Sequence, residues 1–297
     1  MSDAVGQVDL KNYPLLRRGK VRDVFDLGDD LLLVATDRIS AFDVVLPSLL
    51  PMKGVILTDI SLFWFDQIRQ LVPTQLTDTT IDDLNLAPGE FAQVAGRSVI
   101  VRKAERIDIE CVVRAWLAGS AWLEYRNHGT VSGIPMPRGL RRGDRLPSIL
   151  FTPAFKNDNG HDENISIERL QTVVGAELAN ELESASRSIF ELGTNLAADA
   201  GFNLADSKFE FGWIDGKLSV IDEVLTPDSS RYWDAGDVVP GYEPAAYDKQ
   251  IIRDWLEQSG WNKETPGPML PNDIIEKTLD RYRSVADKLR NTTLKGA

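Results

Sequence analysis

Residues 206–223 read DSKFEFGWIDGKLSVIDE, and this stretch decides how the chain folds around its charged groups. Two alternating runs flank Asp215-Gly216. An Asp-Gly pair between such runs is the strongest short-range signal for a β-hairpin. On the first strand Asp206, Lys208 and Glu210 share one face, because side chains alternate with a period of two. The hairpin therefore gathers two acids and a lysine on one surface.

The register of this hairpin decides whether Asp222 can join Glu210. A two-residue turn would pair Glu210 with Ile221 and send Asp222 to the other face. A three-residue loop with a glycine bulge at Gly216 would place Asp222 across from Lys208. We expect the second register, because a divalent cation shared by both carboxylates requires them on one face. Acids and lysines that alternate with aromatic residues are equally typical of a solvent-facing hairpin.

The residue types around the hairpin suit a metal-bound nucleotide that faces an anionic acceptor. Magnesium takes oxygen ligands and keeps several waters, so one or two carboxylates suffice. Lys208 and the more distant Arg231 can offset the negative charge of a moving phosphoryl group. Near the amino terminus, Gly19-Lys20 lies at the mouth of a second expected hairpin, where glycine lets backbone amides approach phosphate oxygens. A lone Gly-Lys pair is also common in surface hairpins.

Composition narrows the class of protein. The chain has 297 residues and a net charge of -12, which argues against nucleic acid as a main partner. Its single cysteine, Cys111, cannot form an intrachain disulfide, and this favours a reducing compartment such as the cytoplasm. Two histidines are too few for a His-rich metal site. The first residues lack the pattern of a signal peptide, and no apolar run approaches the ~20 residues that span a bilayer.

The order of the expected elements indicates an α+β fold. Strands are expected early and helices late, with a helical region from Ser166 to Gly201 that Gly175 breaks. Residues 135–164 are rich in Pro, Gly, Asp and Asn and predict a long irregular excursion. The basic residues 138–145 within it are equally typical of a solvated loop and of anion steering. The other expected elements are strands at 31–35, 98–102 and 110–114, a helix at 58–71, and helices that end at Gly260 and begin at 271–273.

Several motifs taken together resemble those of the SAICAR synthetase family of de novo purine biosynthesis. They run in family order over nearly the whole chain, from about residue 17 to residue 290, and are jointly highly specific. The matching stretches are 19–23, 35–43, 53–54, 61–65, 110–114, 119–122, 161–166, 206–212 and 222–233.

The resemblance implies a two-lobed nucleotide-binding fold that is related to protein kinases and ATP-grasp enzymes, with antiparallel sheets and carboxy-terminal helices. Residues 1–105 would form a β-rich lobe with the phosphate-covering turn, and residues 106–297 an α+β lobe with the metal hairpin and substrate site. The implied activity is an ADP-forming carbon–nitrogen ligase, which joins L-aspartate to the carboxylate of carboxyaminoimidazole ribonucleotide. ATP and Mg²⁺ are the implied cofactors, no membrane is implied, and the protein would be a monomer or small homo-oligomer.

The resemblance also assigns roles residue by residue. Glu210 and Asp222 match metal ligands, and the adenine should lie against residues 102–107. Residues implied to contact the nucleotide are Gly19, Lys20, Val21, Arg22 and Lys103, with Glu210 and Asp222. Substrate contacts are implied for Ser40, Asp43, Arg114, Ser120, Asp206, Lys208, Ser230 and Arg231, of which Asp206, Lys208 and Arg231 are the implied catalytic residues. Aspartate is expected near Ser40, Asp43 and residues 156–162, and Arg22 stands where some relatives carry lysine.

Two other functions fit the hairpin. A kinase-like phosphotransferase could use Asp206 to accept the proton of a hydroxyl acceptor. A nucleotide-binding module without catalysis would need the acids to be structural. The residues Arg114, Ser120 and Ser230-Arg231 suit a phosphorylated carboxylate substrate and favour the ligase.

Overall fold

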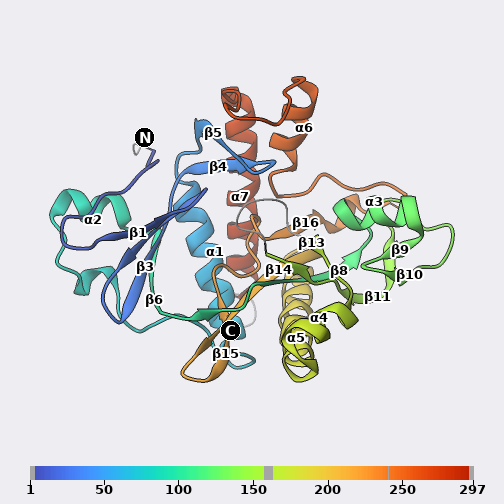
Figure 1. Ribbon diagram of the computed structural model, residues 1–297. Coiled ribbons are helices and arrows are strands. Elements are labelled where there is room, and N and C mark those ends of the chain that lie inside the picture. Colours follow the sequence, from blue (N-terminus) through green and yellow to red (C-terminus); the bar gives the residue numbers. More distant parts are fainter. Residues whose placement is uncertain (1–3, 157–162, 240, 294–297) are drawn as a thin grey trace.

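An antiparallel sheet forms the amino-terminal part of the protein (Figure 1). The computed structural model describes residues 4–156, 163–239 and 241–293. One face of this sheet buries Phe25, Leu32 and Ile100 together with Val94, the last residue of α2 (Pro88–Val94). The strands follow the order β1 (Leu15–Arg18), β2 (Arg22–Asp26), β3 (Asp30–Ala35) and β6 (Ser98–Arg102). The turn that joins β1 to β2 carries Gly19, Lys20 and Val21.

A larger antiparallel sheet is organised around β14 (Phe202–Ile214). This strand pairs with β8 (Ile109–Trp116), and Asp206 lies opposite both Arg114 of β8 and Arg231 of β16. Asp206 is therefore flanked by an arginine on each neighbouring strand. The other strands of this sheet are β7 (Glu105–Arg106), β11 (Arg145–Phe151), β12 (Ala154–Phe155), β13 (Glu163–Asn164), β15 (Lys217–Ile221) and β16 (Ser230–Asp234).

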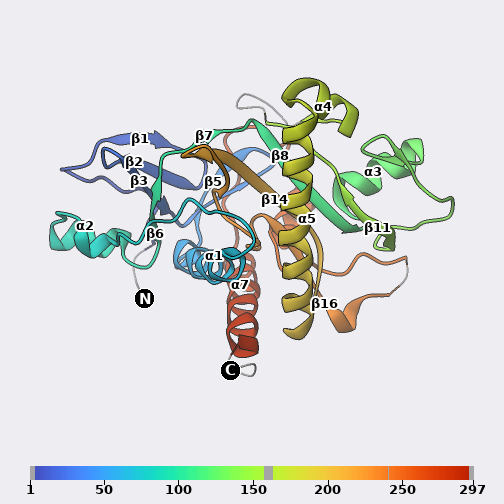
Figure 2. The same cartoon turned by 90° about the horizontal axis from the view of Figure 1, so that it is seen from below.

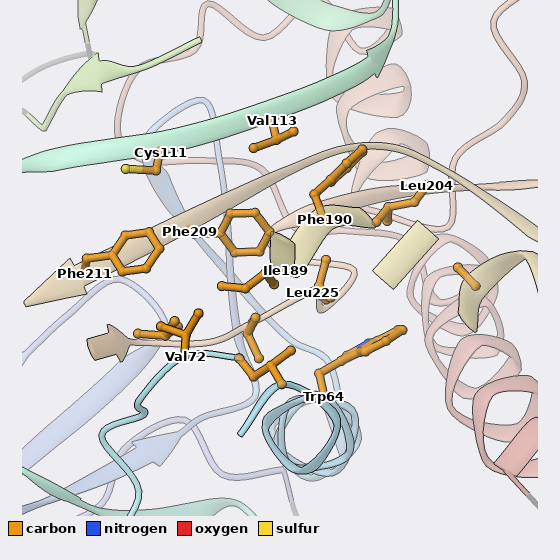
Figure 3. Close-up of a cluster of buried hydrophobic side chains, with 14 of the residues drawn as sticks. Trp64, Val72, Cys111, Val113, Ile189, Phe190, Leu204, Phe209, Phe211 and Leu225 are labelled. Carbon is orange, nitrogen blue, oxygen red and sulfur yellow. The ribbon is translucent and has the colours of Figure 1, made fainter. Parts of the chain in front are cut away.

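Helices cover the apolar face of the larger sheet. Phe209 of β14, Phe190 of α5 (Ala176–Asp199) and Trp64 of α1 (Lys53–Ile68) meet in one buried cluster (Figure 3). Seen from below, α5 runs along the sheet, with α4 (Ile167–Val174) at one end (Figure 2). Apolar burial on this face leaves the opposite face of β14 for charged side chains.

A separate β-hairpin packs against the carboxy-terminal helices. Ile39 of β4 (Arg38–Ala41) and Leu46 of β5 (Val44–Leu49) are buried against Leu256 of α6 (Gln250–Gln258) and Ile274 of α7 (Asn272–Thr293). The long helix α7 also contacts α1, so the hairpin is tied to both parts of the chain. The remaining elements are α3 (Gly119–His128), β9 (Thr130–Val131), β10 (Ile134–Pro135) and the 3₁₀ helices Ile81–Asp83 and Ala235–Asp237.

Two expectations about the elements need correction. The helix expected at 58–71 runs from Lys53 to Ile68, so it begins five residues earlier and ends three residues earlier than expected. Met52, directly before it, has a left-handed backbone conformation. The excursion expected at 135–164 is partly ordered as a sheet, since β11 pairs with β8. The strand was hidden because Pro147 and a register irregularity between Arg145 and Leu150 interrupt its pattern. By contrast, Ser166 caps α4 and Gly175 separates it from α5 as expected.

The expected register of the central hairpin is wrong. Ile214 pairs with Lys217, so Asp215-Gly216 is a two-residue turn, and Glu210 lies opposite Ile221. Both turn residues have positive φ angles, 50° and 71°, which match the tight turn that follows the twist of the strands. The β14–β15 pairing ends at Ile221, so the backbone conformation after the strand, and not the strand pairing, determines where Asp222 lies.

No helix among the residues that the structure describes is long and apolar enough to cross a membrane. The division of the chain into lobes at residue 105 stays a prediction. It falls within β7 (Glu105–Arg106), a strand of the larger sheet that follows β6 of the amino-terminal sheet along the chain.

Gly54 tests how tightly α1 is docked. A Cβ at this position would overlap the carbonyl oxygen of Ala35, and the Gly54 amide donates to the buried Asp37 Oδ1 at 3.0 Å. We expect Gly54→Ala to lower the free energy of unfolding by about 2 kcal/mol, because backbone must move to admit the methyl group. Gly89→Ala in α2 is the control, since nothing lies within 4 Å of its added Cβ. Equal urea midpoints for the two variants would contradict this packing.

Candidate active site

Two arginines converge on Asp206 from the strands beside it. The Asp206 carboxylate accepts from Arg114 Nη1 at 2.7 Å and also pairs with Arg231. Arg114 continues outward, donating to Thr152 Oγ1 at 3.0 Å and to Ser120 Oγ at 3.3 Å. Two guanidinium groups thus share one carboxylate, which leaves an excess positive charge. Such paired planar donors suit a phosphate or carboxylate ligand.

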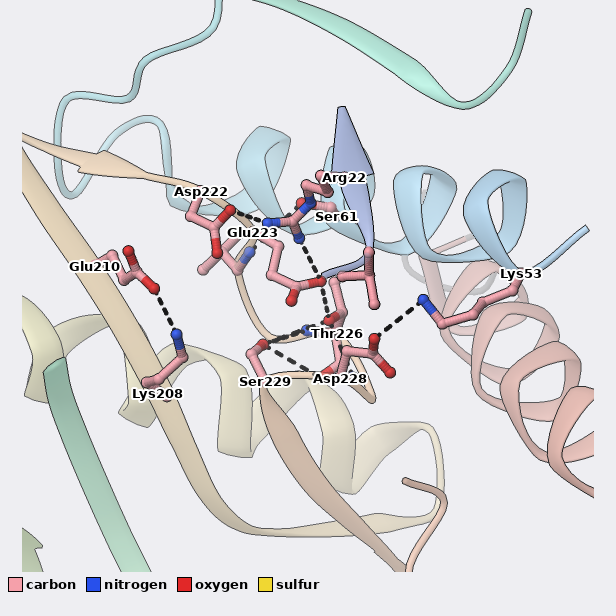
Figure 4. Close-up of polar contacts among 12 residues, drawn as sticks. Arg22, Lys53, Ser61, Lys208, Glu210, Asp222, Glu223, Thr226, Asp228 and Ser229 are labelled. Carbon is pink, nitrogen blue, oxygen red and sulfur yellow. Dashed lines mark hydrogen bonds and ion pairs between the residues drawn. The ribbon is translucent and has the colours of Figure 1, made fainter. Parts of the chain in front are cut away.

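The next two charged residues along the same face form a second set of ion pairs (Figure 4). Lys208 Nζ lies 2.5 Å from Glu210 Oε1 and 3.1 Å from Glu110 Oε1. Glu210 also pairs with Lys156, which follows β12. The contact between Lys208 and Glu210 confirms that the alternating residues of β14 share one face.

These ion pairs shift the pKa values of their members. Burial acts to raise the pKa of Glu210, but the charges of Lys208 and Lys156 outweigh it and hold the pKa at about 2. Burial acts to lower the pKa of Lys208, and the carboxylates of Glu210 and Glu110 together raise it above its ordinary value. Glu210 therefore stays ionised and Lys208 stays protonated across the neutral range. Neither is suited to act as a general base or acid at neutral pH.

A cavity of about 300 Å³ opens above these residues and is called here the β8–β14 cavity. Its wall is strongly charged, and Arg253 of α6 contributes a further guanidinium that pairs with Asp248 at 3.1 Å. The lining includes Glu110, Arg114, Ser120, Lys208, Ser230 and Arg231. The cavity therefore brings most of the predicted substrate residues together in one charged concavity.

A smaller cavity of about 40 Å³ lies between the amino-terminal sheet and α1, and is called here the β3–α1 cavity. Val21, Leu33 and Phe65 form an apolar side, and Arg22 and Asp222 belong to the charged side. Arg22 bridges the two sheets, because its guanidinium pairs with Asp222 and with Glu223 Oε2, the latter at 3.0 Å (Figure 4). The predicted Arg22 and Asp222 are thus neighbours.

The backbone at Asp222 lifts its carboxylate out of the strand pattern. Asp222 follows Ile221, the residue opposite Glu210, and has a φ angle of 65°. A left-handed residue ends the alternation of faces, so the two-residue turn does not by itself separate Asp222 from Glu210. The Asp222 carbonyl is fixed as well, since it accepts from Gln75 Nε2 at 2.9 Å.

Glu210 and Asp222 fit a magnesium ion that is held jointly with a ligand. Among the residues that the structure describes, no group of three or more His, Cys, Asp or Glu side chains could hold a metal alone. Magnesium bound through one or two carboxylates completes its shell with water and phosphate oxygens, so a larger acidic group is not required. Both side chains offer carboxylate oxygens, and their present partners, Lys156, Lys208 and Arg22, are cations.

Some predicted residues lie outside both cavity linings. Lys20 Nζ pairs with Asp43 Oδ1 at 2.5 Å, at the tip of the β4–β5 hairpin, and Ser40 lies on the same hairpin opposite Val45. Lys103 pairs with Asp26 Oδ1 at 2.8 Å, on the amino-terminal sheet. The aspartate site predicted at residues 156–162 falls, apart from Lys156, outside the described residues.

The structure also brings in residues to which the sequence analysis assigned no individual role. Glu110 and Arg253 line the β8–β14 cavity, and Glu223 binds Arg22. Asp228 lines both cavities and pairs with the buried Lys53. Their roles could not be read from the sequence, because each depends on partners that are distant in the sequence.

Acid titration tests the ion pairs of Glu210. Its pKa in the folded protein lies below its ordinary value of 4.5, at about 2, so the stability it contributes is present above about pH 4.5 and lost as the pH falls towards 2. The free energy of unfolding of the wild type should fall as the pH drops from 4.5 to 2. In Glu210→Gln we expect this fall to be smaller by up to about 3 kcal/mol. Denaturant unfolding at several pH values measures it, with the exposed Glu276→Gln as a control for losing a charge. Parallel curves for wild type and Glu210→Gln would contradict the assignment.

Comparison with known proteins agrees with this geometry. The SAICAR synthetase family matches residues 15–268. The phosphoribosylaminoimidazole-succinocarboxamide synthase of Thermodesulfovibrio yellowstonii is 45% identical over 286 residues, covering 96% of this chain and 98% of the relative. A solved structure of SAICAR synthase from Saccharomyces cerevisiae, complexed with SAICAR, is 36% identical with a TM-score of 0.88, covering 96% of this chain and 98% of that one. A SAICAR synthetase in complex with ADP is 22% identical, with a TM-score of 0.67 over 92% of this chain and 96% of that one, and shows likeness of fold.

These matches span nearly the whole chain and decide between the functions left open by the hairpin. The α+β fold of the ATP-grasp-like kind is confirmed, and so is a ligase of purine biosynthesis that joins L-aspartate to carboxyaminoimidazole ribonucleotide at the expense of ATP. The kinase-like alternative also loses its base, since Asp206 is bound by both Arg114 and Arg231. The chain belongs to the SAICAR synthetase family.

Proposed function

We propose that the β8–β14 cavity binds the carboxyaminoimidazole ribonucleotide. Support comes from the excess positive charge of Arg114 and Arg231, which face one carboxylate, and from Ser120 at the start of α3. A phosphate at this position would receive guanidinium, hydroxyl and helix amide donors together. Lys208 and Ser230 line the same cavity, and we assign them to the remainder of the ribonucleotide, with Lys208 nearest the reacting carboxylate.

ATP is assigned to the β3–α1 cavity, with its phosphates under the turn at residues 19–22. The apolar side formed by Val21 and Leu33 suits the base or ribose, and Arg22 lies beside Asp222. Arg22 now pairs with Asp222, and on nucleotide binding it would leave Asp222 and move to the phosphates. The adenine would reach residues 102–107, close to Lys103, and Lys20 would exchange Asp43 for phosphate oxygens.

Glu210 and Asp222 would hold Mg²⁺ between the two ligands. Asp222 lines the β3–α1 cavity, and Glu210 pairs with Lys208, which lines the β8–β14 cavity. When bound, the ion supplies charge neutralisation for the ATP phosphates and fixes their orientation. Lys208 and Lys156 neutralise Glu210 until then, and Arg22 does so for Asp222. Because these side chains are cations, they can turn from the carboxylates to the phosphate oxygens once the nucleotide binds.

The chain's own residues would organise the transfer by charge and position. A carboxylate is a poor acylating agent, and phosphorylation by ATP would convert it into a mixed anhydride that the amine of L-aspartate can attack. Lys208, protonated at neutral pH, would offset charge on the transferring phosphoryl group, and Arg231 would orient the acceptor. Asp206 would hold Arg114 and Arg231 in place, which is positioning rather than proton transfer.

The binding of L-aspartate is proposed near Ser40, Asp43 and Lys156. Lys156 supports this because it directly follows β12 and pairs with Glu210, where a second carboxylate substrate would meet the reacting group. A cytoplasmic location is proposed from the single cysteine, Cys111, which is buried and whose pKa is raised by burial.

A coupled assay of ADP release tests this function. We expect release only when L-aspartate and the carboxylated ribonucleotide are both present with ATP and magnesium. Omission of either substrate is the control within the same preparation. Release with a hydroxyl acceptor alone would support the phosphotransferase instead, and no release under any condition would contradict catalysis.

Asp222→Asn tests the metal assignment at nearly constant volume. We expect kcat to fall by about two orders of magnitude and the magnesium requirement to rise, because one anionic ligand is lost. Asp215→Asn removes a carboxylate from the turn of the same hairpin, where it pairs with Arg102, and should retain wild-type turnover. Normal turnover of Asp222→Asn at saturating magnesium would contradict the assignment.

A further inference from the structure

One short segment connects the charged ends of the two cavities. It runs from Asp222 in the β3–α1 cavity to Arg231 in the β8–β14 cavity, and Asp228 within it lines both. Any change in the placement of this segment therefore alters the distance between the proposed metal ligand and the proposed acceptor site.

The Asp228 carboxylate is buried and held from three separate elements, and Figure 4 shows its contact with Lys53. Lys53 Nζ, at the start of α1, lies 3.2 Å from Oδ2, and Lys249 Nζ, before α6, lies 3.3 Å from the same atom. Tyr282 of α7 donates its hydroxyl to Oδ1 at 2.6 Å. The side chains of Asp228 and Lys53 are 4% and 1% exposed, so this cluster is an internal anchor and not a surface ion pair.

The charges of the cluster bind it firmly together. Burial acts to raise the pKa of Asp228, yet Lys249 and Lys53 outweigh it and hold the pKa below its ordinary value. Loss of the Asp228 charge would leave the ammonium groups of Lys53 and Lys249 without the carboxylate that they share. The anchor therefore resists displacement of Asp228.

Hydrogen bonds connect Asp228 to the end of the segment that carries Asp222. The Asp228 amide donates to Thr226 Oγ1 at 3.2 Å, and the Thr226 hydroxyl donates to Glu223 Oε2 at 2.6 Å. Glu223 in turn accepts from Arg22, which also holds Asp222. A chain of direct contacts thus leads from the anchor to the proposed metal ligand.

The other side of the segment is fixed to β14. The Ser229 carbonyl accepts from the Lys208 amide at 2.9 Å, and Ser230 Oγ donates to Ser207 Oγ at 2.8 Å. Lys208 and Arg231 are thereby held at set positions relative to Asp228. The anchor lies between two groups whose alignment the phosphoryl transfer requires.

We propose that Asp228, held by Lys53, Lys249 and Tyr282, is a positioning residue that aligns the nucleotide cavity with the ribonucleotide cavity for phosphoryl transfer. This inference rests on the residue roles proposed above. It assigns Asp228 no contact with the reacting atoms. A loosened anchor would leave each ligand bound but misaligned, and small misplacements of reacting groups greatly reduce the rate.

Tyr282→Phe and Asp228→Asn test the proposal at two strengths. We expect kcat to fall about tenfold in Tyr282→Phe and about a hundredfold in Asp228→Asn, because alignment is lost in steps. Separate calorimetric titrations with magnesium–ADP and with the carboxylated ribonucleotide should give dissociation constants within about threefold of wild type. This split between turnover and binding is the signature of positioning.

Thr278→Val is the matched control. Thr278 is a buried residue one turn before Tyr282 on α7, and its hydroxyl donates only to the Ile274 carbonyl at 2.8 Å. It should lower the melting temperature much as Tyr282→Phe does while leaving kcat per folded molecule unchanged. If Asp228→Asn does not fold, Tyr282→Phe alone decides the question.

The outcomes separate this inference from the proposed function. Wild-type turnover in Tyr282→Phe would overturn the inference alone, as would affinity losses that match the loss of kcat. A wild-type protein whose ADP release does not depend on the ribonucleotide would overturn the proposed function and this inference with it.

Discussion

The ion pairs along one face of β14 are the interaction on which the site depends. β14 lies between β8 and β16, and its apolar face, with Phe209, is closed by helices. The charged face must then satisfy Asp206, Lys208 and Glu210 largely away from water. Buried charges persist only when paired, so the partners of these residues are fixed by necessity. The same pairing that permits folding places cations and carboxylates in alternation.

This alternation explains how an acidic protein can receive anionic substrates. The net charge of -12 would repel them, but the lining of the β8–β14 cavity is locally balanced. Four cations, Arg114, Lys208, Arg231 and Arg253, stand there against four carboxylates, Glu110, Asp206, Asp228 and Asp248. Nearby groups determine the electrostatic potential that a bound anion experiences, because charges beyond about 10 Å are screened at moderate salt. The basic residues 141 and 142 serve a different role, since Arg142 pairs with Glu243 and Arg141 with Asp144.

The cationic partners also suggest how the site changes when ligands arrive. Lys156 and Arg22 bind Glu210 and Asp222, the two carboxylates assigned to magnesium. Each can pass from a carboxylate to a phosphate oxygen without leaving a charge unpaired. Each charge therefore keeps a partner of opposite sign throughout the exchange. Without cationic partners, the carboxylates of Glu210 and Asp222 would repel each other in a region of low dielectric.

Local signals in the sequence were sufficient for the parts of the fold that depend on neighbouring residues. Asp215-Gly216 predicted the turn, Ser166 and Gly175 the limits of α4, and the alternation in β14 the shared face of its acids and lysine. The motifs that resemble the SAICAR synthetase family identified the family itself.

Features that depend on distant contacts or on one backbone angle could not be predicted in this way. The predicted register of the β14–β15 hairpin was wrong. The left-handed conformation of Asp222 frees its carboxylate from the strand pattern, and this conformation could not be predicted from the sequence. The strand β11 was hidden by Pro147. The partners Lys53 and Asp228 are separated by most of the chain, and their contact exists only once α1 has packed against the segment after β15.

The location of a bound divalent cation tests the central claim most directly. Crystals grown with ADP and manganese would be measured at the manganese absorption edge, where anomalous scattering identifies the ion. The account predicts a peak between the carboxylates of Glu210 and Asp222, with Arg22 moved away from Asp222. A peak coordinated by neither carboxylate, with Arg22 still paired to Asp222, would contradict it.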